Sequence, residues 1–166
     1  MLRELHTQDI SDVTDIYNHY IENTTHTFAE QKVTPDYLLQ QIEASRQKNL
    51  PWLVCENAGQ IIGYAYAGPW KPRSAYRHTV ESSIYLSPEH QGHGVGSELY
   101  SELIQRLREQ TDSHLILAGI TLPNEASVRL HQRLGFEKTA HFKEIGYKFG
   151  QWLDVGYWTL TLPRPV

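Results

Sequence analysis

Apolar residues recur every three or four positions in four stretches of the chain, which is the spacing of amphipathic helices that bury one face. The first stretch contains Ile10, Val13, Ile16 and Ile21. The second begins at Thr34-Pro35, where a capping side chain precedes a proline suited to the first helical turn. The predicted helices cover residues 10–21, 34–48, 99–107 and 124–134, and Gly135 ends the last of them.

Seven other stretches are rich in β-branched and aromatic residues, which predicts strands. Residues 79–86 alternate along such a strand, so that Glu81, Ser83 and Tyr85 share one face. Residues 115–120 are a continuous apolar run, which is typical of a buried central strand. The predicted strands cover residues 2–5, 52–56, 61–67, 79–86, 115–120, 137–149 and 152–162.

The elements follow the order β-α-α-β-β-β-α-β-α-β-β, with hairpin turns at residues 57–60 and 150–151. This order predicts an α/β (α+β) fold in which helices pack on the faces of a mixed sheet. The length of 166 residues and the hydrophobic content of 40% suit one domain, residues 1–166. A domain of this size buries roughly 70% of the surface of its unfolded chain and needs neither disulfides nor a structural metal.

Charge and composition exclude several classes of protein. The net charge of −4 has the wrong sign for a protein that grips nucleic-acid phosphates, so no nucleic-acid partner is expected. Residues 1–6 lack an apolar signal core and no run of about eighteen apolar residues occurs, so no membrane association is expected. The single cysteine, Cys55, lies in an apolar run and has no internal partner, which favours a cytoplasmic protein.

A glycine-rich segment, Gln91-Gly92-His93-Gly94-Val95-Gly96-Ser97, joins a predicted strand to a predicted helix. Bare backbone N–H groups at a helix N-terminus favour an anion such as a phosphate, although the glycines could instead serve only the positive φ angles of a tight connection. The segment is not a P-loop, because no Gly-Lys-Ser/Thr follows. A dinucleotide fingerprint fits poorly, since Asp112, about twenty residues on, precedes the next strand instead of ending it.

The same segment fits the pattern Gln/Arg-x-x-Gly-x-Gly/Ala and resembles the pyrophosphate loop of the GNAT acetyltransferase superfamily, which binds acetyl-CoA. Residues 124–136 resemble that superfamily's Asn-x-x-Ala-x-x-x-Tyr-x-x-x-Gly-Phe element, with His131 at the tyrosine position. The resemblance extends over nearly the whole chain. It implies a single GNAT domain with a central mixed, mostly antiparallel sheet, about four flanking helices, and acetyl-CoA as cosubstrate without a metal.

Further segments narrow the resemblance to the phosphinothricin and methionine sulfoximine N-acetyltransferases. They are Asn23-Thr24-Thr25, Trp70-Lys71-Pro72, Val80-Glu81-Ser82-Ser83-Ile84-Tyr85, the helix with His131, and Lys148-Phe149-Gly150-Gln151-Trp152-Leu153-Asp154. That family acetylates the α-amino group of small amino acids with a tetrahedral phosphorus or sulfur centre. The resemblance implies direct transfer from acetyl-CoA, in a ternary complex, to phosphinothricin, L-methionine sulfoximine or L-methionine sulfone.

Acetyl transfer to an amine needs an anchored CoA, a neutral amine, a polarised carbonyl and a proton for the departing thiolate. The resemblance implies that the backbone N–H of Leu86 donates to the thioester oxygen and that the neighbouring strand edge pairs with the pantetheine amides. The residues expected to contact the cofactor are Ile84, Tyr85, Leu86, Ser87, Gln91, Gly92, His93, Gly94, Val95, Gly96, Ser97, Asn124 and Arg133.

Two side chains compete for the role of the base. Glu81 is the one acid of its strand and would accept the proton of the substrate ammonium, unless it is a solvent-facing residue paired with Arg77. His131 stands at the superfamily's general-acid position, and it either protonates the thiolate, orients the substrate, or is the base while Glu81 orients the amine. Asn124 caps its helix, alone or together with a contact to CoA.

The loop of residues 68–78 concentrates fixed cations in an acidic chain, which suits an anionic acceptor as well as a solvated loop. Lys71, Pro72 and Arg73 are the expected acceptor contacts, and the resemblance adds Phe28 as a pocket wall. His90 and His93 have a metal-like spacing, but no cysteine or carboxylate cluster completes a site, so no metal is expected.

The last predicted hairpin is unusually aromatic, which fits either a core or an interface. The resembling family uses this region in a dimer contact, so a homodimer is expected. Two other functions stay open: the same fold acting on a polyamine, an aminoglycoside or a protein N-terminus, or a non-catalytic acyl-CoA-binding sensor. The basic loop disfavours long cationic acceptors, and the presence of Glu81 and His131 disfavours the sensor.

Overall fold

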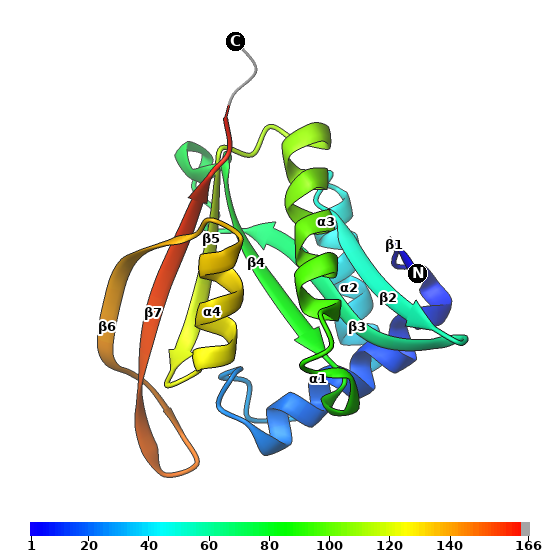
Figure 1. Ribbon diagram of the computed structural model, residues 1–166, viewed down its shortest axis with the longest axis horizontal. Helices are drawn as coiled ribbons and strands as arrows, with labels where there is room; N and C mark the ends of the chain where they lie inside the picture. Colours follow the sequence, from blue (N-terminus) through cyan, green and yellow to red (C-terminus); the bar gives the residue numbers. More distant parts are fainter. Residues whose placement is uncertain (164–166) are drawn as a thin grey trace.

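A twisted sheet of seven strands runs through the middle of the computed structural model, which describes residues 1–163 (Figure 1). The strands are β1 (Leu2–Glu4), β2 (Trp52–Asn57), β3 (Gln60–Pro69), β4 (Thr79–Leu86), β5 (Leu115–Leu122), β6 (Glu137–Lys148) and β7 (Gln151–Thr161). They lie in the order β1-β2-β3-β4-β5-β7-β6, and only the central pair, β4 and β5, is parallel. Residues 164–166 of the expected domain lie outside the described residues.

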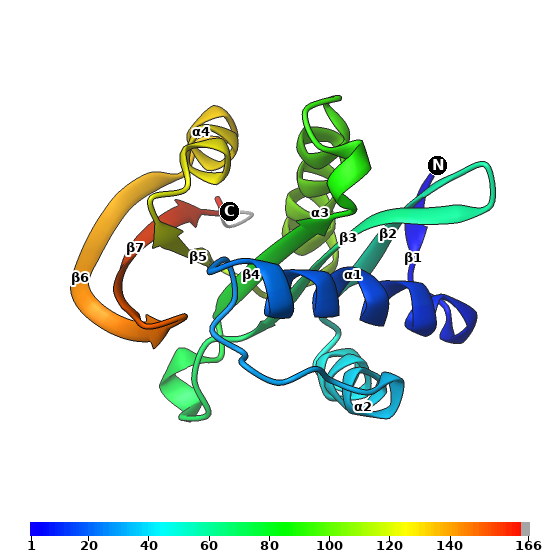
Figure 2. The ribbon, with the colours of Figure 1, turned by 90° about the horizontal axis from the view of Figure 1, so that it is seen from below.

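Four helices cover the sheet, two on each face (Figure 2). Helices α1 (Ile10–Asn23) and α2 (Pro35–Arg46) lie on one face, and α3 (Val95–Gln110) and α4 (Glu125–Arg133) lie on the other. The expected mixed, mostly antiparallel sheet with four helices is therefore confirmed. Within the described part of the chain, no helix is both long and apolar enough to cross a membrane.

Each face of the sheet has its own apolar core. Helix α3 buries Leu99, Leu103 and Leu107 completely, against strand residues such as Ile116. On the opposite face, α1 and α2 enclose a second cluster that is rich in aromatic rings from β2 and β3. The sheet thus separates two packing environments, and a group on one face reaches the other only where the sheet opens.

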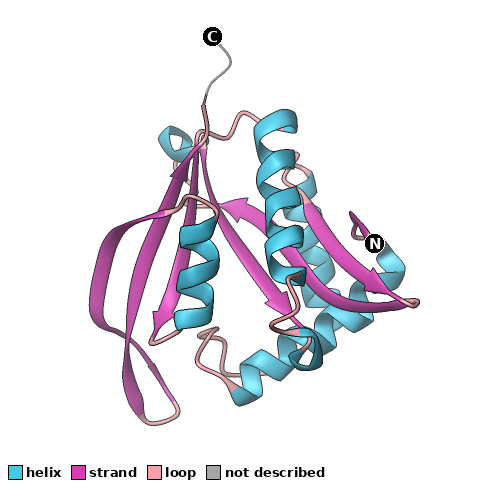
Figure 3. Cartoon of the chain, viewed as in Figure 1, coloured by secondary structure: helices cyan, strands magenta, loops and turns pink. Residues whose placement is uncertain are grey.

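The sheet opens between β4 and β5. Their register covers three pairs, which end at Glu81 and Leu117, and the strands diverge beyond that point (Figures 1 and 3). On its other side β4 stays paired with β3, and the Ser87 N–H donates to the Ile62 carbonyl. Because backbone groups alternate in direction along an antiparallel strand, those of Ile84 and Leu86 face the gap.

Most element boundaries agree with the sequence pattern to within two residues. Strand β3 extends to Pro69, two residues past the predicted end, because residues 63–69 pair with β4. Helix α2 ends at Arg46 instead of Lys48. Gln151 belongs to β7 and not to the hairpin turn, and β6 is interrupted by an irregularity between Phe142 and Gly146.

The prediction of a buried central strand at residues 115–120 is only partly right. The strand β5 continues to Leu122, and Gly119 in its middle is exposed. The reason is the divergence of β4, which leaves one side of β5 without a neighbour from Ala118 onward. An apolar run cannot reveal this opening, because it does not show on which side a strand has lost its neighbour. On its other side β5 stays paired with β7 over its whole length.

Candidate active site

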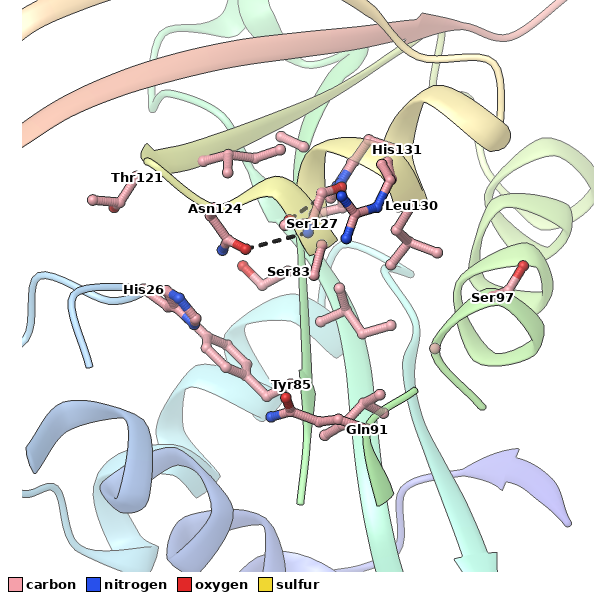
Figure 4. A pocket seen from close by; sticks show the side chains of 18 of the residues that line it. His26, Ser83, Tyr85, Gln91, Ser97, Thr121, Asn124, Ser127, Leu130 and His131 are labelled. Atoms are coloured by element: carbon pink, nitrogen blue, oxygen red, sulfur yellow. Dashed lines mark hydrogen bonds between the residues drawn. The ribbon is translucent and has the colours of Figure 1, made fainter. Parts of the chain in front are cut away.

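A cavity of about 440 Å³ lies in the gap between β4 and β5 (Figure 4). Its walls come from β4, β5, α4, the glycine-rich loop and the end of α1. The cavity brings together these residues that the sequence predicted for the site: Ile84, Tyr85, Leu86, Gln91, Gly92, Gly94, Gly96, Ser97, Asn124, His131 and Arg133. The predicted residues Glu81, Ser87, His93, Val95, Phe28, Lys71, Pro72 and Arg73 do not line it.

The glycine-rich loop enters α3 through two glycines with positive φ angles. Gly92 has φ +81° and Gly94, the residue that precedes the helix, has φ +84°. Gly96 lies against the β4 side chains, where an added Cβ would be 3.3 Å from a methyl group of Leu86. The glycines therefore serve the positive φ angles of a tight connection, as one interpretation of the sequence had it. The loop also presents the unpaired N–H groups of a helix N-terminus at the cavity.

The open edge of β4 is in contact with α1. The Tyr20 hydroxyl donates to the Leu86 carbonyl oxygen at 2.7 Å, accepts from Gln91 Nε2 at 3.0 Å, and lies 3.4 Å from the Leu86 nitrogen. Burial raises the pKa of Tyr20, which keeps this donor protonated. The Leu86 backbone thus has a side-chain partner already, whereas the N–H of Ser87 points away from the cavity, toward β3.

His131 lies beneath the cavity on the α3 side of the sheet and is 3% exposed. Its Nδ1 lies 2.8 Å from the Ser127 carbonyl oxygen, and its Nε2 lies 3.0 Å from the Tyr100 hydroxyl. Because a carbonyl oxygen only accepts, this geometry places the ring proton on Nδ1 and makes Tyr100 the donor to Nε2. The Tyr100 hydroxyl also lies 2.6 Å from Ser82 Oγ on β4. Burial lowers the pKa of His131, which favours the neutral ring.

Glu81 lies on the opposite face of the sheet from His131. Ser82 points to α3, so its neighbour Glu81 points to the face that carries α1 and α2, as the strand alternation predicts. Burial raises the pKa of the half-buried Glu81 carboxyl group. The alternative pairing with Arg77 is absent among the described residues, since Arg77 donates instead to the Ser74 carbonyl.

A cluster of aromatic rings centred on Tyr157 lies beside the Glu81 carboxylate. Tyr157 lies near it, and burial together with the charge of Glu81 raises the pKa of Tyr157. The rings of Trp70 and Phe142 each meet Tyr157 edge-on, with centroids 5.7 Å away. Gly119 lets the Tyr157 ring and Glu81 lie close to β5, because an added Cβ would be 3.1 Å from Tyr157 Cε1 and 3.6 Å from Glu81 Oε1. The basic loop lies next to these rings, with Lys71 Nζ 5.2 Å from the centroid of Trp70.

Sequence reasoning missed several residues of the cavity. Tyr20, His26, Thr121 and Ser127 line it, and none of them was predicted. Tyr20 shares the apolar stripe of α1 with core residues, so its pattern indicated only packing. His26 and Thr121 carry no local signal, because their positions depend on the path of a connection and on the opening of the sheet.

Asn124 and His90 have local structural contacts. The side chain of Asn124 accepts a hydrogen bond from the Ser127 N–H, which is the predicted cap, and Asn124 also faces the cavity (Figure 4). His90 Nδ1 lies 3.4 Å from Ser87 Oγ. Residues 1–163 contain no cluster of three histidine, cysteine or acidic side chains suited to a metal ion.

Comparison with known proteins places this geometry in a family. Residues 2–156 match the family model of the acetyltransferase (GNAT) domain. The chain is 44% identical to a phosphinothricin N-acetyltransferase of Streptomyces viridochromogenes, an alignment that covers 95% of this chain and 88% of the relative. It is 41% identical to an L-methionine sulfoximine/L-methionine sulfone acetyltransferase of Salmonella typhimurium, over 93% of this chain and 90% of the relative.

A solved acetyltransferase structure has the same fold as this chain. An acetyltransferase from Salmonella typhimurium, determined with its cofactor acetyl-CoA, superposes with a TM-score of 0.96 at 38% identity. The superposition covers 100% of this chain and 95% of the other. With the glycine-rich loop at a helix N-terminus and a sheet that opens beside it, the chain belongs to the acetyltransferase (GNAT) family and is an N-acetyltransferase.

Proposed function

We propose that this enzyme transfers the acetyl group of acetyl-CoA to the α-amino group of a small amino acid with a tetrahedral phosphorus or sulfur centre. Phosphinothricin, L-methionine sulfoximine and L-methionine sulfone are the proposed acceptors, and transfer is direct, within a ternary complex in the cytoplasm. The observation that carries the proposal is the opening between β4 and β5, because Gly119, which lines the cavity there, also lies next to Glu81. The named activities of the relatives support the acceptor class.

The residues of the cavity fit acetyl-CoA. The N–H groups at the start of α3 suit a pyrophosphate, and the free backbone edge of β4 suits the amides of pantetheine. Arg133 is exposed at the rim and supplies a cation. Acetyl-CoA supplies the activated acetyl group when bound, and this chain contributes the groups that hold the thioester and receive the proton.

We assign the polarisation of the thioester carbonyl to the Ile84 N–H instead of the Leu86 N–H. Both face the gap, but the Leu86 backbone is already bonded to Tyr20. Ile84 is also two residues nearer to Glu81, which is about 7 Å along a strand. The acceptor amine must lie close to both the base and the carbonyl carbon, so the nearer donor is the better placed. Leu86 keeps its contact with Tyr20 in this assignment.

Glu81 is the proposed base. It lies on the acceptor face, and burial raises its pKa from that of an ordinary glutamate toward the working pH, which improves it as a proton acceptor. The α-ammonium of an amino acid must lose a proton before it attacks, directly to Glu81 or through a water molecule. Neutral His131, with partners on both ring nitrogens, fits a positioning role better than direct proton donation.

Recognition of the acceptor falls to the groups around Glu81. Trp70 and Tyr157 form an apolar wall, and the exposed cations Lys71 and Arg73 suit a carboxylate or a phosphinate oxygen. Pro72 holds the two cations in one loop. A polyamine would meet this positive loop unfavourably, which supports a small anionic acceptor.

A homodimer is proposed from the hairpin formed by β6 and β7. Its side chains Phe142, Ile145, Tyr147, Phe149 and Trp152 are 47% to 63% exposed, an unusual concentration of apolar area for a free surface. A groove of about 520 Å³ borders this patch at Trp152. A second copy of the chain would cover the patch.

The acceptor class is tested by the release of CoA thiol from acetyl-CoA in the presence of single amines. We expect turnover with L-methionine sulfoximine, L-methionine sulfone or phosphinothricin, and none with a polyamine, an aminoglycoside or an N-terminal peptide. Turnover only with the latter group would refute the acceptor class. A silent panel despite tight binding of acetyl-CoA would favour the sensor.

The base is tested by Glu81→Gln, with Glu43→Gln on the exposed side of α2 as the control. Loss of the proton acceptor should lower kcat/KM by on the order of 10² to 10⁴. In the unaltered enzyme kcat/KM should rise with pH as Glu81 loses its proton, at a higher pH than an ordinary glutamate would titrate, because burial raises its pKa. If kcat/KM of Glu81→Gln still rises over the same pH range, another group is the base.

The loop is tested by Gly94→Val, with Gly59→Val in the β2–β3 turn as a matched control. Both glycines have similar positive φ angles, +84° and +82°, and neither has an atom within 4 Å of an added Cβ. The two variants therefore carry similar backbone strain. Only Gly94→Val should raise the KM for acetyl-CoA, by about tenfold, because the altered loop no longer reaches the phosphates. Equal behaviour of the two variants would make the loop a mere connector.

Oligomeric state is tested by light scattering on the purified protein, Trp152→Asp and Tyr37→Asp. We expect twice the mass of the chain for the unaltered protein and for Tyr37→Asp, whose exposed ring lies on α2. Trp152→Asp introduces a charge into the aromatic patch and should give a monomer. The mass of one chain for the unaltered protein would contradict the proposal.

A further inference from the structure

Lys148 is 1% exposed, which makes it the most deeply buried charged side chain of the described residues. No carboxylate lies within 4 Å of its ammonium in this part of the chain. Instead, Nζ donates to the Thr24 carbonyl at 2.8 Å and to the Thr27 carbonyl at 2.9 Å, and it lies 4.9 Å from the ring centroid of Phe149. The side chain therefore joins β6 to the connection between α1 and α2.

This connection, residues 24–34, forms one border of the site. His26 lines the cavity, and the ring of Phe28 packs on Gly146 of β6 so closely that an added Cβ would be 2.3 Å away. The path of this connection therefore sets one wall of the site.

The other hydrogen bonds of the connection lead back to α1. The Thr24 hydroxyl donates to the Tyr20 carbonyl, and the side chain of Asn18 bonds both backbone groups of Val33. The Thr27 hydroxyl also lies 3.0 Å from the Tyr17 hydroxyl of α1, so these contacts hold the connection to α1 at both ends and in the middle, but none of them reaches the β6–β7 hairpin. Among the described residues, Lys148 supplies the polar link between the two.

The chemistry of the side chain fits such a link. Burial of an ammonium without a carboxylate partner costs free energy, as the lowered pKa of Lys148 reflects. A methionine would fill the same space without that cost but would leave two buried carbonyl groups without donors. The two hydrogen bonds from the ammonium offset this cost. They hold the carbonyl groups of Thr24 and Thr27 at hydrogen-bond distance from Lys148 of β6.

We propose that Lys148 is a positioning residue, which locks the α1–α2 connection against β6 and thereby fixes the acceptor-side wall that contains His26 and Phe28. The inference rests on the proposed function, since it assigns the wall to the acceptor. The hydrogen bonds of Lys148 go to Thr24 and Thr27 and not to the glycine-rich loop or the β4 edge, so the main effect is expected on the acceptor.

The experiment compares Lys148→Met with Lys143→Met, an exposed lysine of the same strand. Lys148→Met should raise the KM for the acceptor at least tenfold and leave the Kd of acetyl-CoA within twofold, whereas Lys143→Met should change neither. Unchanged acceptor KM in Lys148→Met would overturn the proposal. A parallel loss of acetyl-CoA affinity would also overturn it, since that result indicates general damage to the fold.

A second variant covers the case in which Lys148→Met does not fold. Gly146→Ala pushes the Phe28 ring away from β6 with Lys148 intact, and it should raise the acceptor KM in the same selective way. Unchanged acceptor KM in this variant would contradict the assigned wall.

Amide hydrogen exchange separates failure of this inference from failure of the proposed function. Lys148→Met should speed exchange at the amides of His26 and Ala29, which are bonded within the connection, at least tenfold. This readout needs no acceptor. Faster exchange without turnover of any tested amine would refute the acceptor class and support the lock, whereas unchanged exchange would refute the lock itself.

Discussion

The parallel pairing of β4 with β5 stops after Glu81 and Leu117, and the rest of the site depends on that stop. Two strands of one sheet normally satisfy each other's backbone groups along their whole length. Here the ladder ends after three pairs, so that the backbone groups of Ile84 and Leu86 face a cavity, where Tyr20 bonds those of Leu86, and Glu81 stands where the opening begins. The same divergence exposes Gly119 in the middle of an apolar strand.

Local chemistry was sufficient to predict the elements and one half of the site. Helix caps, alternation and glycine-rich turns have causes within a few residues, so the helices, the strands and the loop from Gln91 to Ser97 could be located from the sequence. The opening of the sheet has no local cause, and neither has the position of His26. Both arise from the packing of elements far apart in the chain, which explains why the acceptor side was harder to predict than the cofactor side.

The two candidate catalytic side chains lie on opposite faces of the sheet, which their spacing along the chain cannot reveal. Alternation puts Glu81 on the face of α1, whereas His131 is held under the opposite face by Tyr100 and the Ser127 carbonyl. A base is needed where the amine arrives, which favours Glu81. The buried neutral histidine joins α4 to α3, and through Tyr100 to Ser82 on β4.

The two apolar cores on opposite faces of the sheet have a consequence for how such an enzyme changes over time. Substitutions among the aromatic residues around Tyr157 alter one face, while the packing of α3 that supports the glycine-rich loop lies on the other. Because distant, unconnected sites contribute almost independently to stability, substitutions around Tyr157 leave the packing of α3 nearly unchanged. One face of this sheet can thus accumulate substitutions for which the other face does not have to compensate.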